Sequence, residues 1–511
     1  MNNAPHLPLV GLRRSDFRKA LQGPVRAHPA VAELAALRRN HEAVGRILGK
    51  GAPVYGINTG FGSLAGTSIA ADRLAELQRN LLLSHCTGVG APLEDSVVRL
   101  MLLLKIASLA RGYSGVAPAT VLALAALLES DLLPIVPSKG SVGASGDLAP
   151  LAHLGTVLLG IGQVRQHGRI ISASEALAIA DLKPLNLGPK EGLALINGTQ
   201  ASTALAIAGA LRTEDLLAAG LLAGAMSTDA LRGSDSPFDT LIHAVRPHPG
   251  QRRIAQTLRI LLAGSTIRES HRDCVRVQDP YSFRCQPQVM GACLDTLEHC
   301  LNVLEIEANS VTDNPLIFDE HDVALSGGNF HAEPIAFAAD FLAIALSEIA
   351  NLSERRLSVL LDTKMSGLPA FLVDNSGLNS GFMIMQVTAA ALVSENKTLA
   401  HPASIDSIPT SANQEDHVSM ATFAARRLGD IADNCTAVVG IELLAAAQGI
   451  DFCRPLRSSD FIESAHRDIR ARVPHLDADR YMHPDIEAIC TLIRSGTLIQ
   501  PVRAVLAGAA Q

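Results

Sequence analysis

The sequence lacks the paired cysteines that mark many zinc-binding and redox-active proteins. It has eight cysteines in 511 residues, and no two of them form a Cys-x-x-Cys pair. This spacing excludes a zinc ribbon and a thioredoxin-like motif. The first residues also lack the basic start and continuous apolar core that a secretion signal needs. We therefore expect reduced thiols in a cytoplasmic protein.

An excess of basic charge is also missing. The 43 lysines and arginines are outnumbered by 50 acidic residues, which gives a net charge of -7 and a pI near 6.2. Without a basic stripe, a nucleic acid or an anionic membrane is not expected as a partner. Charged residues make up only 18% of the chain and hydrophobic residues 48%. This balance excludes extensive disorder and predicts a sizeable buried core.

Long stretches rich in alanine and leucine predict a mainly α fold. They cover residues 97–109, 117–128, 201–226, 334–361 and 434–448. Several are apolar on more than one face, so other helices must cover them, which favours a long central helical bundle and self-association. The 201–226 stretch is not expected to span a membrane, because Arg212, Glu214 and Asp215 lie within it.

The remaining pattern predicts a smaller N-terminal region with loops and short strands. We place this region at residues 1–110 and the central and C-terminal helical body at 111–511. Strand-like runs occur at 53–57 and 316–318, and glycine-rich loops at 56–66, 139–146 and 326–329. Loops carried on a rigid helical scaffold are common places for catalytic residues.

The most informative segment covers residues 140–153 and reads GSVGASGDLAPLAH. It is a turn of small residues that leads into a helix. Asp147 or Ser145 is suited to cap that helix, and Pro150 fits its first turn. Taken alone, Ala-Ser-Gly is most simply interpreted as an ordinary helix start.

The same three residues also permit a specific reaction. The Gly146 nitrogen can attack the Ala144 carbonyl, whose oxygen leaves as one water, and the Ser145 hydroxyl can leave as a second. The product is a 4-methylidene-imidazol-5-one ring, which is an electron-poor alkene. Glycine allows the close approach that this cyclisation requires because it has no side chain.

An ordered series of motifs accompanies this segment. The series comprises Tyr55-Gly-Ile-Asn-Thr-Gly-Phe-Gly62, Ser84-His85, Asn197-Gly-Thr-Gln200, Gln278-Asp-Pro-Tyr281-Ser-Phe-Arg284, Gly328-Asn-Phe330-His-Ala-Glu333 and Gln414-Glu415-Asp-His417. Each motif is weak alone, but with the Ala-Ser-Gly segment they span from Val54 to beyond Gly449. In this order they make the sequence resemble the aromatic amino-acid ammonia-lyases, and within them the histidine-directed branch.

The resemblance implies a fold, an assembly and a reaction. Relatives of this kind form homotetramers whose active sites collect residues from more than one subunit. The implied reaction converts L-histidine into trans-urocanate and ammonia on the electrophile made from Ala144, Ser145 and Gly146, without a dissociable cofactor. Tyr55 is then the base that removes the β proton, and Tyr281 assists in proton handling.

The resemblance also implies the residues that bind the substrate. Arg284 is expected to pair with the substrate carboxylate through two parallel hydrogen bonds. Asn197 and Gln278 are expected to orient the carboxylate and the ring oxygen. At the other end, His85 and Glu415 supply partners for the imidazole nitrogens, and Phe330 packs against the ring.

Several alternatives stay open at this point. The same chemistry on tyrosine, phenylalanine or a modified histidine is one, an aminomutase is another, and a non-enzymatic helical scaffold is a third. His85 with Glu415 argues against a phenyl or phenol ring, which would leave the carboxylate unpaired. No metal is expected, because neither His331-Ala-Glu333 nor Glu415-Asp-His417 has His-Glu-x-x-His spacing.

Overall fold

The structure is a computed structural model that describes residues 4–272 and 276–509. The chain divides into two compact units, which are each assembled from three segments. Unit 1 comprises Met1–Gly209, Cys300–Asp340 and Pro402–Arg426, and unit 2 comprises Ala210–His299, Phe341–His401 and Arg427–Gln511. These divisions lie at other positions than the residue 110 suggested by the sequence. Three helices, α9 (Gln200–Ala230), α14 (Gln286–Ala308) and α15 (Glu333–Leu361), each contribute residues to both units.

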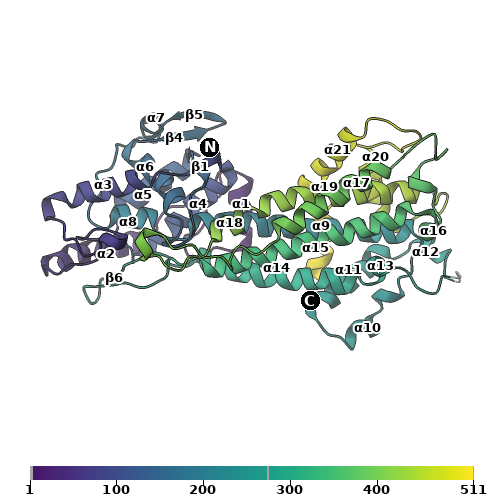
Figure 1. Cartoon of the computed structure of the whole chain (residues 1–511), viewed down its shortest axis with the longest axis horizontal. Coiled ribbons are helices and arrows are strands. Elements are labelled where there is room, and N and C mark those ends of the chain that lie inside the picture. The colour runs from purple at the N-terminus through teal and green to yellow at the C-terminus, as the bar shows by residue number, and fades with distance from the viewer. Residues whose placement is uncertain (1–3, 273–275, 510–511) are drawn as a thin grey trace. The chain divides into compact units, whose positions relative to one another are not determined.

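Unit 1 contains all the strands labelled in Figure 1, together with helices of up to 19 residues of its own. Its helices are α1 (Arg14–Gln22), α2 (Val31–Gly49), α3 (Leu74–His85), α4 (Asp95–Ala110), α5 (Pro118–Glu129), α6 (Leu148–Thr156), α7 (Ala173–Ile179), α8 (Glu191–Ile196) and α18 (Ala421–Arg426). Short 3-10 turns are η1 (Gly62–Leu64), η2 (Ala71–Arg73), η3 (Val157–Leu159) and η6 (Ser411–Asn413).

The strands of unit 1 are short and pair only with antiparallel neighbours. One pair joins β1 (Val89–Pro92) and β3 (Pro137–Lys139), and another joins β6 (Leu316–Phe318) and β7 (Val323–Leu325). A three-stranded sheet has the order β2 (Leu133–Pro134), β4 (Gln163–Gln166) and β5 (Arg169–Ser172). These small sheets connect helices and do not form a core of their own.

Unit 2 is built almost entirely of helices. They are α10 (Thr240–Ala244), α11 (Pro249–Leu262), α12 (Thr266–Glu269), α13 (Tyr281–Arg284), α16 (Thr363–Ser366), α17 (Met383–Leu399), α19 (Leu428–Asp451), α20 (Asp460–Arg470), α21 (His483–Arg494) and α22 (Gln500–Gly508), with η4 (Ser236–Phe238) and η5 (Ala370–Leu372). The helices shared with unit 1 are α9 (Gln200–Ala230), α14 (Gln286–Ala308) and α15 (Glu333–Leu361).

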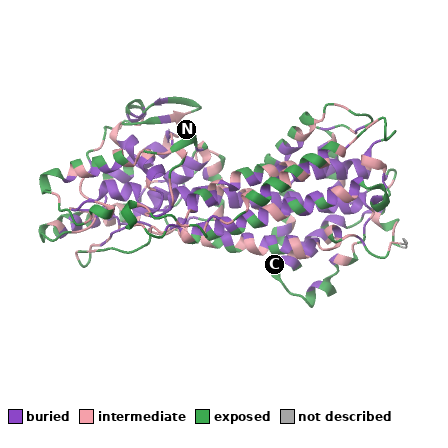
Figure 2. Ribbon diagram, viewed as in Figure 1, coloured by how far each residue is buried: buried purple, intermediate pink, exposed green. Residues whose placement is uncertain are grey.

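The predicted mainly α fold is confirmed. Four of the five Ala/Leu-rich stretches lie within α4, α9, α15 and α19, and the stretch 117–128 begins one residue before α5. Every residue of α4 from Val97 to Ala110 is buried, as expected for a helix that is apolar on all faces. Figure 2 shows buried residues along the long helices and exposed residues mainly in loops and on outer helix faces.

By length and composition, one of the described helices, α15, would suffice to cross a membrane. In its most apolar window, 67% of the residues are buried inside the protein. The core helices of globular proteins have the same composition, so this feature is weak evidence for a membrane.

One of the two strand predictions is wrong. Residues 53–57 form no strand, because the chain turns where Ile57 N–H and Asn58 N–H both donate to Val54 O, at 3.1 and 3.2 Å. Gly56 has a φ of +73°, which an extended strand does not allow. The prediction for 316–318 is confirmed by β6, because β7 supplies a pairing partner.

Within unit 2, a buried ion pair joins α15 to α19. Arg356 Nε and Nη2 donate to the two carboxylate oxygens of Glu442 at 2.5 and 2.7 Å. Neither side chain is exposed to solvent (0% each). Ser227 Oγ and Ser353 Oγ also donate to this carboxylate, at 2.7 and 2.6 Å. The carboxylate is therefore fully satisfied without water.

Candidate active site

A cavity of about 900 Å³ lies within unit 1. Its wall combines the loop after Tyr55, the end of α3, the start of α6, the end of α8 and the segments that contain Phe330 and Glu415. The predicted site residues that line it are Tyr55, His85, Ala144, Ser145, Asn197, Phe330 and Glu415. The fold of unit 1 alone therefore brings most of the predicted residues around one space.

The segment before α6 forms a tight turn that requires glycine at two positions. Gly143 and Gly146 have φ angles of +67° and +73°. A Cβ atom at Gly146 would lie 2.1 Å from Gly198 O, and one at Gly143 would lie 2.2 Å from Ser419 Oγ. The neighbouring Asp147 N–H donates to Gly198 O at 2.7 Å. A side chain at Gly146 would displace the backbone of Gly198, and one at Gly143 would displace the Ser419 side chain and strain a positive φ.

The turn presents Ser145 to a carboxylate that is distant in the sequence. Ser145 Oγ donates to Glu415 Oε1 at 3.0 Å, across a separation of 270 residues. The other oxygen, Glu415 Oε2, accepts from Thr410 Oγ1 at 2.6 Å. Thr410 and Glu415 also exchange two backbone hydrogen bonds of 3.0 and 3.3 Å. The orientation of the carboxylate is thus set by its own loop.

Asp147 occupies the position that caps α6, but its side chain makes no capping hydrogen bond. Its carboxylate instead accepts from Ser202 N–H at 2.6 Å, from Ser202 Oγ at 2.9 Å and from Thr422 Oγ1 at 2.6 Å. The predicted cap by Asp147 is therefore wrong, since α9 and α18 compete for the same oxygens. Pro150 lies in the first turn of α6, as predicted.

Asn197 lines the cavity with its side-chain amide held from one side. Its Nδ2 donates to Asn314 O at 2.8 Å and to Asp313 Oδ1 at 3.2 Å. Lys190 Nζ fixes the other oxygen of Asp313 at 2.6 Å. Among the described residues, the buried Asn197 Oδ1 has no hydrogen-bond partner. Buried amide oxygens rarely stay unpaired, so a ligand N–H is a suitable partner for this one.

Lys105, which no sequence motif singled out, contacts the backbone of Asn197. Lys105 is 1% exposed, and its Nζ donates to Asn197 O at 2.7 Å and to Gln200 Oε1 at 3.4 Å. Burial lowers the pKa of Lys105 from its usual 10.5 to about 7. The signal in the sequence is a single lysine in the apolar run from Val97 to Ala110.

The lowered pKa of Lys105 makes a prediction for stability. Above pH 7 the folded protein holds Lys105 largely uncharged, whereas the unfolded chain still binds the proton. The contribution of Lys105 to stability therefore rises with pH, by up to about 1.4 kcal/mol per unit. We expect the Lys105→Met variant to lack this rise when urea unfolding is compared at pH 7 and pH 9. The exposed Lys183→Met variant should behave as the unaltered protein does, and equal slopes in all three would contradict the assignment.

Tyr55 lies at the start of the loop that borders the cavity. Gly62 N–H donates to its Oη at 3.4 Å, and its ring meets the Phe61 ring edge-on. Burial raises the pKa of Tyr55; the Gly62 hydrogen bond opposes this rise, and the Glu415 charge adds to it. Within this chain the phenol is thus not activated as a base, and activation requires a further donor or positive charge.

The tautomer of His85 follows from its contacts. His85 Nδ1 lies 2.8 Å from Leu81 O and 3.1 Å from Ser84 Oγ. A carbonyl oxygen only accepts, so Nδ1 carries the proton and Nε2 is left with a lone pair. Burial lowers the pKa of His85, which favours the neutral ring. The side chain is therefore suited to accept a hydrogen bond from a ligand.

Four predicted residues do not line the cavity. One is Gly146, which is buried in the turn next to Ser145. Gln278, Tyr281 and Arg284 belong to unit 2, in α13 and the segment before it. The Arg284 guanidinium carbon lies 4.6 Å from the centre of the Tyr281 ring, and Tyr281 is 71% exposed. Arg284 Nε is buried and has no hydrogen-bond partner in the part of the chain described.

The fold also joins two motifs that the sequence analysis treated separately. His331 and Glu333 come from one motif and His417 from another, and their potential ligand atoms lie within 4.8 Å of one another. His331 and His417 line the same cavity as Ser145. Sequence spacing alone does not predict this grouping, because the two motifs are more than 80 residues apart.

Comparisons with known proteins agree with this fold. The chain is 59% identical to the histidine ammonia-lyase of Paracidovorax citrulli over 475 residues, which cover 93% of each protein. The solved histidine ammonia-lyase of Trypanosoma cruzi superposes with a TM-score of 0.90 at 39% identity, covering 99% of this chain and 96% of that one. Tyrosine aminomutase from Streptomyces globisporus superposes with a TM-score of 0.91 at 35% identity, covering 97% and 98%. Because residues 12–471 also match the family described as aromatic amino acid lyases, this chain belongs to that family.

Proposed function

We propose that this protein converts L-histidine into trans-urocanate and ammonia. The observation that carries the proposal is the arrangement of His85 and Glu415 around Ser145 in one cavity. Two polar side chains with lone pairs at one end of a cavity suit an imidazole ring, whose N–H groups require acceptors when water is removed. The name of the relative that is 59% identical supports the same substrate.

The residues of the tight turn fit a methylidene-imidazolone formed from Ala144, Ser145 and Gly146. Positive φ angles and the absence of Cβ atoms at Gly143 and Gly146 allow the chain to fold closely on itself. Asn197 Oδ1, which has no partner among the residues described, and the half-buried Ser145 provide a polar setting beside it. Once formed, this group would supply an electron-poor alkene carbon that accepts the substrate nitrogen, and no dissociable cofactor is needed.

The other residues would bind and orient the substrate. His85 Nε2 accepts from one imidazole N–H, and Glu415 accepts from the second when the ring is protonated. The half-buried Phe330 covers the ring with an apolar surface. Tyr55 would take the β proton once a neighbouring donor or positive charge opposes the rise of its pKa.

We further propose that a homotetramer completes the site in the cytoplasm. Arg284 would bind the substrate carboxylate through two parallel hydrogen bonds, with Gln278 beside it and Tyr281 assisting proton transfer. These residues lie outside the lining of the cavity in this chain, and Gln278 and Tyr281 are exposed. A neighbouring subunit would bring these residues to the cavity, and its arginine would supply the positive charge that Tyr55 requires.

A substrate panel tests the proposed reaction. The purified protein should form urocanate from L-histidine, followed by its absorbance, and should form little cinnamate or coumarate from phenylalanine or tyrosine. The appearance of a β-amino acid would favour the aminomutase alternative, which the likeness to a tyrosine aminomutase makes worth testing. Absence of turnover with every aromatic amino acid would contradict the proposal.

A charge-neutral variant tests the role of Glu415. We expect Glu415→Gln to lower kcat/KM for histidine by about 10- to 100-fold, because a hydrogen bond to a charged group contributes about 1.5–3 kcal/mol. The control is Glu76→Gln, which makes the same change on the exposed surface of α3. Unchanged kinetics for Glu415→Gln would remove this residue from substrate binding.

A further inference from the structure

We propose that His331, Glu333 and His417 form a binding site for a divalent transition-metal ion, with Zn²⁺ as the best match. The potential ligand atoms of these residues all lie within 4.8 Å of one another. Ligands around a tetrahedral zinc ion at about 2.1 Å are about 3.4 Å apart. The three side chains are therefore near the required separation, and a movement of about 1 Å in the exposed His417 ring would suffice.

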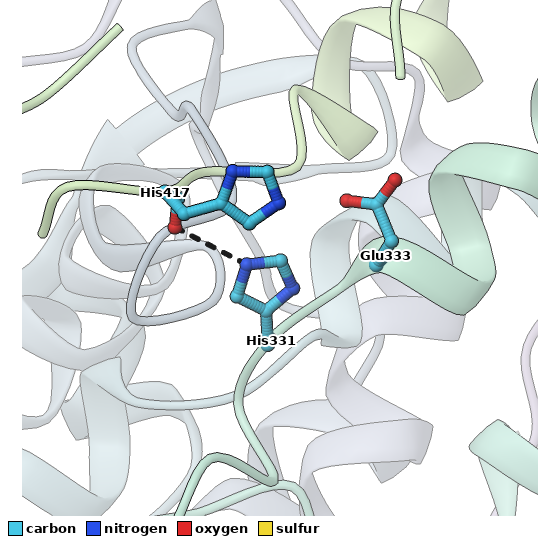
Figure 3. A group of neighbouring side chains, drawn as sticks. All are labelled: His331, Glu333 and His417. Carbon is cyan, nitrogen blue, oxygen red and sulfur yellow. Dashed lines mark hydrogen bonds between the residues drawn. The ribbon is translucent and has the colours of Figure 1, made fainter. Parts of the chain in front are cut away.

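The three side chains reach this place from two separate segments. His331 and Glu333 belong to the entry into α15, and His417 belongs to the loop that precedes α18. Figure 3 shows the two imidazole rings and the carboxylate facing a common space. The imidazole rings are nearly parallel, with an interplanar angle of 15° and centroids 5.7 Å apart.

The contacts of His331 prepare one of its nitrogens for a metal. His331 Nε2 lies 3.2 Å from His417 O, as the dashed line in Figure 3 marks. Because a carbonyl oxygen only accepts, Nε2 carries the proton and Nδ1 keeps its lone pair. Metal-binding histidines usually donate their second ring N–H to a carbonyl or carboxylate in this way. The carbonyl of a second ligand, His417, thus sets the tautomer of the first.

The carboxylate of Glu333 has a buried oxygen that is available to a cation. Its Oε2 is buried and has no hydrogen-bond partner among residues 4–272 and 276–509. A buried carboxylate oxygen without a donor is costly, and a cation between the three groups would satisfy it.

The donor set selects the class of metal. Two imidazoles and one carboxylate suit zinc and other transition metals, whereas magnesium and calcium prefer oxygen ligands. Three protein ligands leave a further coordination position, as in zinc sites that bind water or a small molecule. His331 and His417 line the cavity that contains Ser145, so that position is expected to be accessible from it. This inference does not depend on the identity of the substrate.

Calorimetry on the full-length protein tests the site. The protein is first treated with a chelator, the chelator is removed, and ZnCl2 is titrated. We expect one Zn²⁺ per chain and no comparable binding of Mg²⁺. The Glu333→Gln and His417→Ala variants should each weaken Zn²⁺ binding at least about tenfold. Since His417 is exposed, its replacement should leave the far-UV circular dichroism spectrum unchanged.

The control is His483→Ala, which removes another exposed histidine at the start of α21. It should bind Zn²⁺ as tightly as the unaltered protein does. A second readout is the visible absorption of bound Co²⁺, which reports coordination by imidazole and carboxylate independently of activity. Absence of stoichiometric Zn²⁺ binding would overturn the proposal. Equal affinity in the unaltered protein, Glu333→Gln and His417→Ala would also overturn it, and would assign the ion to another group such as the thiols.

Discussion

Ser145→Ala should lower the rate of histidine elimination by a factor of at least about 10³. Enzymes accelerate their reactions by about 10⁶-fold or more, and this variant removes the hydroxyl whose loss creates the proposed electrophile. In the uncyclised chain the substitution deletes one oxygen from a half-buried side chain and removes a single 3.0 Å hydrogen bond to Glu415. The fold should therefore persist while the chemistry stops.

Intact mass provides the decisive measurement for this variant. The unaltered protein should be lighter than its sequence by two water molecules, because ring closure and loss of the Ser145 hydroxyl each release one. Ser145→Ala should lack the loss that comes from the hydroxyl. Ser96→Ala, which changes a serine on α4 that does not line the cavity, should keep both the mass loss and the activity. An active protein with the unmodified mass would contradict the proposed electrophile.

The largest loss of stability is expected from Glu442→Gln. This change keeps the shape of the side chain but leaves the Arg356 guanidinium buried without its counter-charge, and both residues are 0% exposed. Breaking one partner of such a pair costs about 3–5 kcal/mol, since the remaining charge stays desolvated. Urea unfolding followed by far-UV circular dichroism measures the difference.

Two further variants make this prediction specific. Glu76→Gln disrupts the exposed ion pair with Arg73, whose side chains are 52% and 66% exposed, and should cost less than about 1 kcal/mol. The double variant Arg356→Met/Glu442→Leu removes both buried charges and should recover much of the lost stability. A small effect of Glu442→Gln would show that water reaches this ion pair.

Much of the fold class was predictable because it depends on local patterns. Stretches rich in alanine and leucine favour helices wherever they occur, and α4, α5, α9, α15 and α19 lie where the sequence predicted helices. The strand prediction at 53–57 failed for the opposite reason. A strand needs a partner, and the backbone hydrogen bonds to Val54 O close a turn there instead.

The order of the motifs also predicted which residues to examine, and seven of them line one cavity. Their positions relative to one another were not predicted. Ser145 and Glu415 are 270 residues apart and meet through one hydrogen bond, which no local pattern encodes. The Lys105 contact with Asn197 and the grouping of His331 with His417 likewise arise from chain folding.

Local composition thus decided which segments become helices and which residues can react, because backbone propensity and side-chain chemistry belong to each residue. Long-range packing decided the rest. It diverted the Asp147 carboxylate from its own helix to Ser202 and Thr422, left Asn197 Oδ1 without a partner among the described residues, and lowered the pKa of Lys105 to about 7. Desolvation and hydrogen-bond competition depend on neighbours from distant segments, and those neighbours exist only after folding.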